Sequence, residues 1–314
     1  MIFKKPIFWN DINFISLFFL PLSVITFIIN YLKKFKIKKN FKIRSICIGN
    51  LYIGGTGKTP LAISVNNILK KKFKTTFVKK KYSNQIDEQN ILKKYGSLLC
   101  YNYRDVALKI AEKKRFEVAI LDDGLQDKSI NYNLTIACFN SKEGIGNGFL
   151  IPAGPLRENI SEIKNYDAVF LNGEKKNIKL KKKIKNIKPD MDIFEANYIP
   201  KNIKNFNLKK NFLIFSGIGN PEEFERTLIK YKFKIKQKFF FPDHYKYSSR
   251  EINNLKKIAQ NKKLDILTTE KDYLRLNNKD KKGINFLKIE LVIKNRKNFI
   301  KFLSNNIWKI LFIF

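Results

Sequence analysis

The sequence predicts an α/β protein of two α/β/α domains, preceded by an N-terminal membrane-associated helix. Three observations lead to this prediction. Short apolar runs alternate with stretches of helical spacing, which is typical of parallel sheets covered by helices on both faces. A glycine-rich loop that ends in Gly-Lys-Thr follows the first of these apolar runs. An uncharged segment, residues 12–32, precedes them all.

Length and composition agree with this plan. The 314 residues leave room for two cores, and a hydrophobic content of 44% excludes a disordered chain. We expect an N-terminal helix with a basic linker over 1–40, the glycine-loop domain over 41–200, and a smaller α/β domain over 201–314.

The charge of the chain does not indicate a nucleic-acid partner. The formal net charge is +36, yet 55 of the 63 basic residues are lysines, and they are scattered along the chain. An anionic membrane surface or an anionic substrate explains the charge as well as nucleic acid does. The three cysteines show no paired spacing, which indicates a reducing compartment without disulfides or a zinc site.

The uncharged segment 12–32 is rich in Phe, Ile and Leu. Its length of about 20 residues is enough for a single membrane span. Pro21 and several polar residues make an interfacial helix an equal alternative, and a helix buried against the domain is a third. The lysines that follow, between 33 and 39, would hold this end on the anionic cytoplasmic side.

The alternation of patterns gives the order of the elements. In the first domain the predicted strands are 46–48, 75–78, 118–121, 134–139 and 168–171, and the predicted helices are 60–71 and 104–113. A lysine-rich stretch, 175–188, reads as a solvated helix or loop. In the second domain, a strand at 212–215 leads through a glycine turn to a helix that starts at Pro221, with Asn220 as its N-cap, and 265–267 is a further strand.

The glycine-rich loop predicts a phosphate site. Its candidate binding residues are Gly54, Gly55, Thr56, Gly57, Lys58 and Thr59. Main-chain amides and the following helix N-terminus attract phosphate, the lysine reaches the outer phosphates, and the threonine hydroxyl can ligate Mg²⁺. The usual spacing places a glycine where Tyr52 stands, so this is a displaced form of the P-loop. We therefore expect a P-loop domain that binds ATP or GTP.

Two carboxylates follow a predicted buried strand. Asp122 and Asp123 come directly after 118–121, and ligands of open parallel sheets lie at the carboxyl ends of the strands. Enzymes with a P-loop hold Mg²⁺ or its waters with carboxylates in this place. We favour a metal role for both residues over a simple polar turn.

The single histidine, His244, is the candidate general base. A kinase that phosphorylates an alcohol benefits from a group that takes the hydroxyl proton, and imidazole titrates near neutrality. A lone histidine is more often structural, so this assignment needs a carboxylate that orients the ring. Asp243 is adjacent in sequence, but the partner can also come from elsewhere in the chain.

Five motifs in order resemble those of the tetraacyldisaccharide 4′-kinases, the lipid A kinases. They are Gly49 to Pro60, Asp122 to Gln126, Gly146 to Glu158, Phe241 to His244, and Thr269 to Asp272. That family also lacks glycine at the position of Tyr52. The order and the spacing agree from about residue 15 to residue 275.

The resemblance implies an enzyme on the cytoplasmic face of the inner membrane that uses ATP and Mg²⁺. It would phosphorylate the 4′-hydroxyl of a tetraacylated glucosamine disaccharide 1-phosphate, with the N-terminal helix on the membrane and two hinged α/β/α domains. In the family an aspartate of an Asp-Glu pair assists the histidine, and this pair matches Asp87 and Glu88. The resemblance thus implies Asp87 and His244 as the catalytic residues, brought to the phosphate by domain closure. We expect a monomer.

The resemblance also carries over five candidate contacts to substrate or phosphate: Tyr82, Arg104, Gln126, Arg157 and Glu158. For Arg104 the alternative is a surface arginine at a helix start. The chain departs from the family in two places. Asp127 stands where the family has histidine, and lysines fill positions 79–81 in place of a Ser-Arg-Gly stretch.

Two other functions deserve comparison. A switch ATPase of the partitioning or metal-chaperone type shares the Gly-Gly-Thr-Gly-Lys-Thr loop but carries a lysine before the paired glycines, where this chain has Ile53. A basic nucleic-acid-binding protein would show clustered arginines and aromatic platforms. Neither is present in the sequence.

Overall fold

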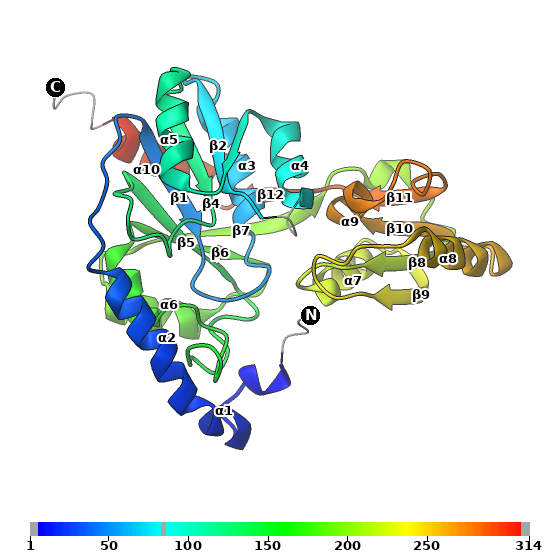
Figure 1. The fold of residues 1–314 in the computed structure, drawn as a ribbon. Helices are drawn as coiled ribbons and strands as arrows, with labels where there is room; N and C mark the ends of the chain where they lie inside the picture. Colours follow the sequence, from blue (N-terminus) through cyan, green and yellow to red (C-terminus); the bar gives the residue numbers. More distant parts are fainter. Residues whose placement is uncertain (1–5, 83–85, 309–314) are drawn as a thin grey trace. The chain divides into compact units, whose positions relative to one another are not determined.

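A computed structural model of the chain describes residues 6–82 and 86–308. The chain forms two compact units (Figure 1). The larger contains residues 6–82, Leu92–Tyr198 and 291–308, and the smaller contains 86–91 and Ile199–Glu290. Both are α/β units with parallel sheets, which confirms the predicted fold class. The division differs from the expected boundary, because 291–308 returns to the larger unit and 86–91 belongs to the smaller one.

The larger unit is built on an eight-stranded sheet in the order β12-β7-β6-β5-β1-β4-β2-β3 (Figure 1). Its strands are β1 Arg44–Gly49, β2 Thr75–Lys80, β3 Leu98–Tyr101, β4 Val118–Asp122, β5 Leu134–Asn140, β6 Ala168–Asn172, β7 Asp192–Pro200 and β12 Ile289–Ile293. The pairs from β7 to β3 are parallel. Because such strands are buried on both faces, they read as continuous apolar runs. This is why β1, β2, β4, β5 and β6 are evident in the sequence.

Helices cover both faces of this sheet. On one face lie α3 Lys58–Leu69 and α10 Arg296–Trp308, and on the other lie α5 Arg104–Lys113 and α6 Ile178–Ile187. Ile46 of β1 packs in the cluster that contains Phe299 of α10, whereas its neighbour Cys47 packs in the cluster of α5 and α6. The lysine-rich stretch 175–188 therefore contains a helix that buries its apolar stripe, Leu180 and Ile184.

The smaller unit has a four-stranded parallel sheet in the order β11-β10-β8-β9. Its elements are β8 Asn211–Ser216, α7 Pro221–Lys230, β9 Lys234–Phe240, α8 Ser249–Asn261, β10 Asp265–Thr269, α9 Glu270–Arg275 and β11 Ile284–Leu287. Residues 86–91 of α4 Ile86–Tyr95 also belong to it, and the rest of α4 belongs to the larger unit. Asn220 caps α7 as predicted, because its side chain accepts a hydrogen bond from the Glu223 amide at 3.2 Å. Strand β9 is polar, and its residues alternate between half-buried and exposed, so the sequence shows no apolar run that would predict a strand there.

The uncharged N-terminal segment forms two short helices, α1 Phe14–Phe18 and α2 Leu20–Lys33, after a 3-10 turn at Ile7–Trp9. In the part of the chain that the structure describes, no helix has the length and apolar character needed to cross a bilayer.

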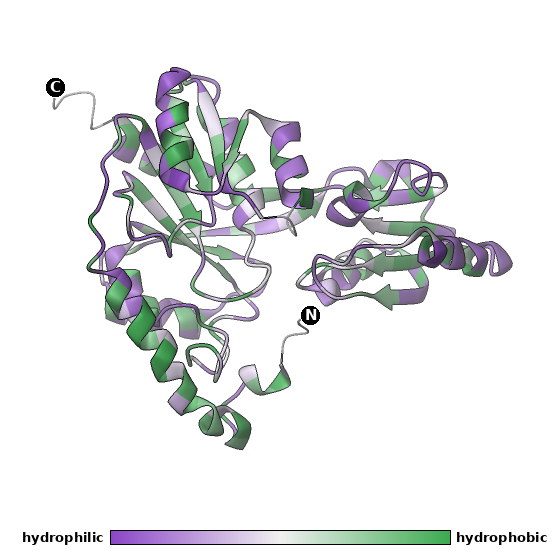
Figure 2. Ribbon diagram, in the orientation of Figure 1, coloured by the Kyte–Doolittle hydropathy of each residue, from purple (hydrophilic) through white to green (hydrophobic). Residues whose placement is uncertain are grey.

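The polar residues of α2 form its contact with the larger unit. Ser23, Thr26 and Asn30 lie on one face and donate hydrogen bonds to main-chain carbonyls of segment 150–157 at 2.8, 2.7 and 2.6 Å. The apolar residues of α2 face outward, with Ile25 56% and Phe27 52% exposed, as the green colour of this helix shows (Figure 2). The helix is thus attached by its polar side, and its apolar side is open.

Candidate active site

The glycine loop connects β1 to α3. Gly54 and Gly57 have φ of 127° and 82°, which favour glycine because other residues rarely adopt these values. Gly57 is the N-cap of α3, and a Cβ added there would overlap the Tyr198 hydroxyl and the Asn172 side-chain amide. Asn172 also donates to the Thr56 carbonyl at 2.5 Å. The loop therefore turns tightly against β6 and β7, with its amides at a helix N-terminus.

Tyr52 explains why this loop lacks the usual first glycine. Its side chain is buried in a small apolar cluster with Leu150 and Leu156, and its hydroxyl donates to Glu143 at 3.1 Å. Burial raises the pKa of Tyr52 well above its usual value, and the nearby Glu143 carboxylate adds to this. The next amide, of Ile53, donates to the Pro155 carbonyl at 2.9 Å. The loop is thus anchored to the third motif by a tyrosine.

Thr59 and Asp122 lie together at the carboxyl end of β4. The Thr59 hydroxyl donates to Asp122 Oδ2 at 3.0 Å. Asp122 is fully buried, and its Oδ1 has no hydrogen-bond partner among the described residues. Hydroxyl and carboxylate oxygens are the ligands that Mg²⁺ prefers. An unpartnered buried carboxylate oxygen beside a hydroxyl fits a divalent cation at this place.

Sequence reasoning missed the cation that lies on Asp122. Lys79 is 2% exposed, and its Nζ lies 2.8 Å from Asp122 Oδ2. The register of β2 and β4, which pairs Val78 with Leu121, places the two side chains at neighbouring strand ends. The only signal in the sequence is a lysine that continues an apolar strand toward the sheet edge where the carboxylates lie.

The second carboxylate, Asp123, is held by Arg157. Arg157 Nη1 lies 2.9 and 3.1 Å from the two Asp123 carboxylate oxygens and donates to Gln126 Oε1 at 3.2 Å. Gln126 in turn donates to the Asn50 carbonyl at 2.9 Å. Burial alone would raise the pKa of Asp123, but Lys58, Arg157 and Lys79 outweigh it and lower the pKa. The structure thus brings Gln126, Arg157 and Asp123 together, and Gln126 connects this group to Asn50, at the end of β1.

Arg104 begins α5, yet it is not a surface residue. Its side chain is 10% exposed, donates to the Asp123 carbonyl and lies 3.3 Å from Asp127 Oδ2. Burial alone would lower the Arg104 pKa, but nearby anionic groups, including Asp127 and Asp123, outweigh it and raise the pKa. The aspartate that stands in place of the family's histidine is therefore the ionic partner of Arg104, and together they fix the turn after β4.

Two candidate contacts lie apart from this group. Glu158 is buried, accepts a hydrogen bond from the Tyr166 hydroxyl at 2.7 Å, and pairs with Lys128 at 3.0 Å. Tyr82 is 39% exposed just after β2, where the Lys80 ammonium lies 5.5 Å from the centre of its ring. The contacts of Glu158 are those of a structural ion pair.

In the smaller unit, His244 lies against Asp87. Its Nδ1 is 3.3 Å from Asp87 Oδ1, and Asp87 is buried near the start of α4. His244 has φ of 59°, and its main-chain amide donates to the Gly217 carbonyl at 3.2 Å. The structure therefore brings together the two residues that the family resemblance paired, although 157 positions separate them.

Cations surround the Asp87 carboxylate. Lys271 Nζ lies 3.5 Å from Asp87 Oδ2, 3.2 Å from Glu88 and 3.6 Å from Asp243. Burial alone would raise the pKa of Asp87, but the hydrogen bond with His244 and the charges of Lys271 and Arg275 outweigh it, so the pKa lies below its usual range. Asp87 is thus an ionised hydrogen-bond acceptor for the imidazole.

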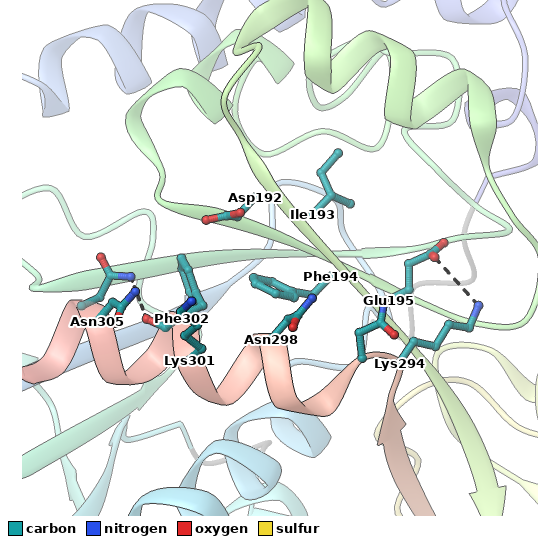
Figure 3. Close-up of a pocket in the computed structure, with 11 residues that line it drawn as sticks. Asp192, Ile193, Phe194, Glu195, Lys294, Asn298, Lys301, Phe302 and Asn305 are labelled. Carbon is teal, nitrogen blue, oxygen red and sulfur yellow. Dashed lines mark hydrogen bonds and ion pairs between the residues drawn. The ribbon is translucent and has the colours of Figure 1, made fainter.

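A cavity of about 620 Å³ lies between β7 and α10 (Figure 3). Its lining includes Phe194 and Glu195 of β7 and Asn298 and Phe302 of α10. None of the residues predicted for the active site lines it. The cavity therefore has no part in the candidate site.

Comparison with known proteins gives a consistent result. The model of the family described as tetraacyldisaccharide-1-P 4′-kinase matches residues 15–97 and 87–307. The chain is 46% identical over 299 residues to the tetraacyldisaccharide 4′-kinase of Pelagibacter ubique (strain HTCC1062), covering 94% of this chain and 95% of the relative. It is 33% identical to that of Rickettsia typhi (strain ATCC VR-144 / Wilmington), covering 92% and 94%.

The fold is also that of a solved structure. The chain is similar to the "apo" form of LpxK from Aquifex aeolicus in complex with ATP, with a TM-score of 0.71 and 23% identity over 93% of this chain and 99% of that chain. At this identity the likeness concerns the fold. The extent of the family match and the identity to the Pelagibacter relative confirm the resemblance in the motifs: this chain belongs to the tetraacyldisaccharide 4′-kinase family.

Proposed function

We propose that this chain transfers the γ-phosphate of ATP to the 4′-hydroxyl of a tetraacylated glucosamine disaccharide 1-phosphate, a step of lipid A biosynthesis. Membership in the family supports the substrate class. The pairing of His244 with Asp87 is the observation that carries the proposal, because transfer to an alcohol needs a group that takes the hydroxyl proton, and an imidazole oriented by a carboxylate is such a group.

The larger unit supplies the groups for the nucleotide. Amides from Gly54 to Thr59 and the Lys58 ammonium would bind the β- and γ-phosphates. Thr59, Asp122 and Asp123 would hold Mg²⁺, which offsets negative charge on the transferred group. The unpartnered Oδ1 of Asp122 supports this assignment. Lys58 and Arg157 favour the ionised form of Asp123, and Arg157 also holds its carboxylate through a direct contact.

The smaller unit supplies the proton acceptor. When the Nδ1 proton of His244 is donated to Asp87, the lone pair of Nε2 is available to the acceptor hydroxyl. Asp87 orients the ring and stabilises the imidazolium that forms. Because one chain contains both the phosphate loop and the base, we propose that it acts as a monomer.

The apolar face of α1 and α2 supports a location at the surface of the inner membrane, on its cytoplasmic side. Phe14 and Phe18 are 83% and 71% exposed, and such a contiguous apolar surface is typical of membrane or protein contact. The lysines after α2 favour anionic headgroups. The proposed acceptor is a lipid held in the membrane, so an enzyme that phosphorylates it must reach the membrane surface.

Ile25→Asp in α2 tests this location. We expect it to weaken binding to anionic vesicles about tenfold or more, because a buried isoleucine contributes about 1.5–3 kcal/mol. Ile229→Asp is a matched control, since Ile229 of α7 is 58% exposed and Ile25 is 56% exposed. The measurement is the fraction of protein that floats with anionic vesicles in a density gradient. If this fraction is equal for the two variants, α2 does not contact the membrane.

The transfer itself is tested with γ-labelled ATP and an acylated disaccharide 1-phosphate in mixed micelles. We expect label in the lipid product, and none when the acceptor carries no free 4′-hydroxyl. Slow release of labelled phosphate without any labelled lipid would instead support the switch ATPase.

A further inference from the structure

Arg275, the last residue of α9, is a buried cation that no sequence motif singled out. Its side chain is 8% exposed. One arm of the guanidinium, Nη2, lies 2.7 Å from Asp87 Oδ2, and the other arm, Nη1, lies 2.7 Å from Asp272 Oδ1. Arg275 therefore connects the carboxylate that contacts His244 to a second, deeper carboxylate.

Asp272 is a fixed anchor for this arginine. It is fully buried at the start of α9, and its Oδ1 accepts hydrogen bonds from the Gly217 amide at 3.1 Å and the Tyr247 hydroxyl at 3.0 Å. Its Oδ2 accepts from the Thr269 hydroxyl at 2.7 Å. Because both oxygens are held, the guanidinium that pairs with them has a defined direction.

Arg275 also supports the main chain of His244. Its Nη1 donates to the Gly217 carbonyl, and the same carbonyl accepts the His244 amide at 3.2 Å. His244 adopts a φ of 59°, in the left-handed region that is uncommon for residues other than glycine, so contacts that hold its backbone matter. The Arg275 side chain thus contacts the Asp87 carboxylate, which lies beside the His244 ring, and the Gly217 carbonyl, which accepts the His244 main-chain amide.

The charge of Arg275 bears on the protonation of the base. Three carboxylates face the ring: Asp87 at Nδ1, and Glu88 and Asp243 at 3.9 and 3.8 Å from Nε2. The described cations next to this group are Lys271 and Arg275. Removal of one cation makes the surroundings of the ring more negative, which favours the imidazolium. A protonated imidazole cannot accept the proton of the acceptor hydroxyl.

We propose that Arg275 is a positioning residue for the Asp87–His244 pair: its guanidinium fixes the carboxylate that orients the imidazole, and its positive charge offsets part of the negative charge of the carboxylates that face the ring. This inference rests on the proposed function, in which His244 is the base. Nothing in the mechanism requires Arg275 to touch substrate or nucleotide.

The single histidine permits a direct test, because the ring signals of histidine-labelled protein belong to His244 alone. In Arg275→Met the NMR titration midpoint of the ring should move to higher pH. Turnover at neutral pH should fall about tenfold to a hundredfold, as for a misplaced catalytic group. The acidic limb of the turnover profile should move in the same direction, and the KM for ATP should stay unchanged.

Two further variants separate charge from geometry. Arg275→Lys keeps the charge but lacks the two-armed fork, so we expect a midpoint close to that of the parent protein and a turnover that still falls. Arg250→Met is the control, since Arg250 is an exposed arginine of the same unit. Circular dichroism establishes that each variant is folded, and Arg275→Lys remains informative if Arg275→Met does not fold.

The proposal is overturned if Arg275→Met or Arg275→Lys is folded and turns over like Arg250→Met. It is also overturned if the midpoint in Arg275→Met equals that of the parent protein. The titration needs no substrate, so failure of the transfer assay in the parent protein would refute the proposed function and leave this test standing.

Discussion

Replacement of Lys79 by methionine isolates the cation on Asp122. Lys79 is 2% exposed, Asp122 is fully buried, and their charged atoms lie 2.8 Å apart. Methionine fills similar volume but leaves the Thr59 hydroxyl as the one side-chain partner of the carboxylate among the described residues. Removing one partner of a buried ion pair destabilises a protein by about 3–5 kcal/mol. For a unit of this size we expect a loss in melting temperature of about 6–20 °C.

A double-mutant cycle makes this prediction sharp. Lys79→Met combined with Asp122→Asn removes both charges, so most of the loss should be recovered, and the two effects should be non-additive by more than about 0.5 kcal/mol. Lys81→Met serves as control, because Lys81 is exposed two residues further along the chain. The measurement is thermal and urea unfolding followed by circular dichroism. Additive losses, or a Lys79→Met variant as stable as Lys81→Met, would refute the reasoning.

Three further predictions concern the site. His244→Ala should lower turnover by about two to four decades with ATP affinity kept, measured by steady-state kinetics and calorimetry. Because the Asp87 pKa lies below its usual range, its carboxylate stabilises the fold above about pH 4 and loses this effect as the pH falls through the folded-state pKa. The difference in melting temperature between parent and Asp87→Asn should therefore narrow in acid. Gly57→Ala should weaken ATP binding about tenfold or more, because an alanine at φ of 82° is strained and its Cβ would overlap Tyr198. In the control Gly55→Ala the added Cβ meets no atom within 4 Å, so ATP affinity should fall less.

Much of the fold was predictable because strands buried on both faces consist of consecutive apolar residues, which are visible in the sequence. Strand β4, Val118–Asp122, is apolar at each position before its terminal aspartate. The loop before α3 was predictable for another reason, because its glycines and lysine are the residues that a phosphate site needs. Most strands that the sequence did not reveal lie at sheet edges, namely β3, β9, β11 and β12, whereas β7 lies one strand inside. β9 is one of these, and its alternating lysines resemble a solvated segment.

The contacts of the site were less predictable, because they join residues that the fold brings together from distant positions. Lys79 reads as a defect in a family motif, yet it is buried against Asp122. The polar residues of α2 read as interruptions of a membrane segment, yet they form its contact with segment 150–157. Asp87 was paired with His244 through the family resemblance, and spacing alone gave no reason to choose it.

The return of the chain to the larger unit after residue 290 has a consequence for biosynthesis. β12 and α10 complete the nucleotide-binding sheet, and Phe299, Leu303 and Ile307 fill one of its two cores. These residues leave the ribosome after the whole of the smaller unit, because they follow Glu290 in the chain. Until then β7 has a partner, β6, on one side only, and its other edge lies beside an incomplete core, which makes a surface prone to aggregation. Nascent chains that stall between residues 200 and 290 should therefore recruit chaperones, and early termination there should yield insoluble protein.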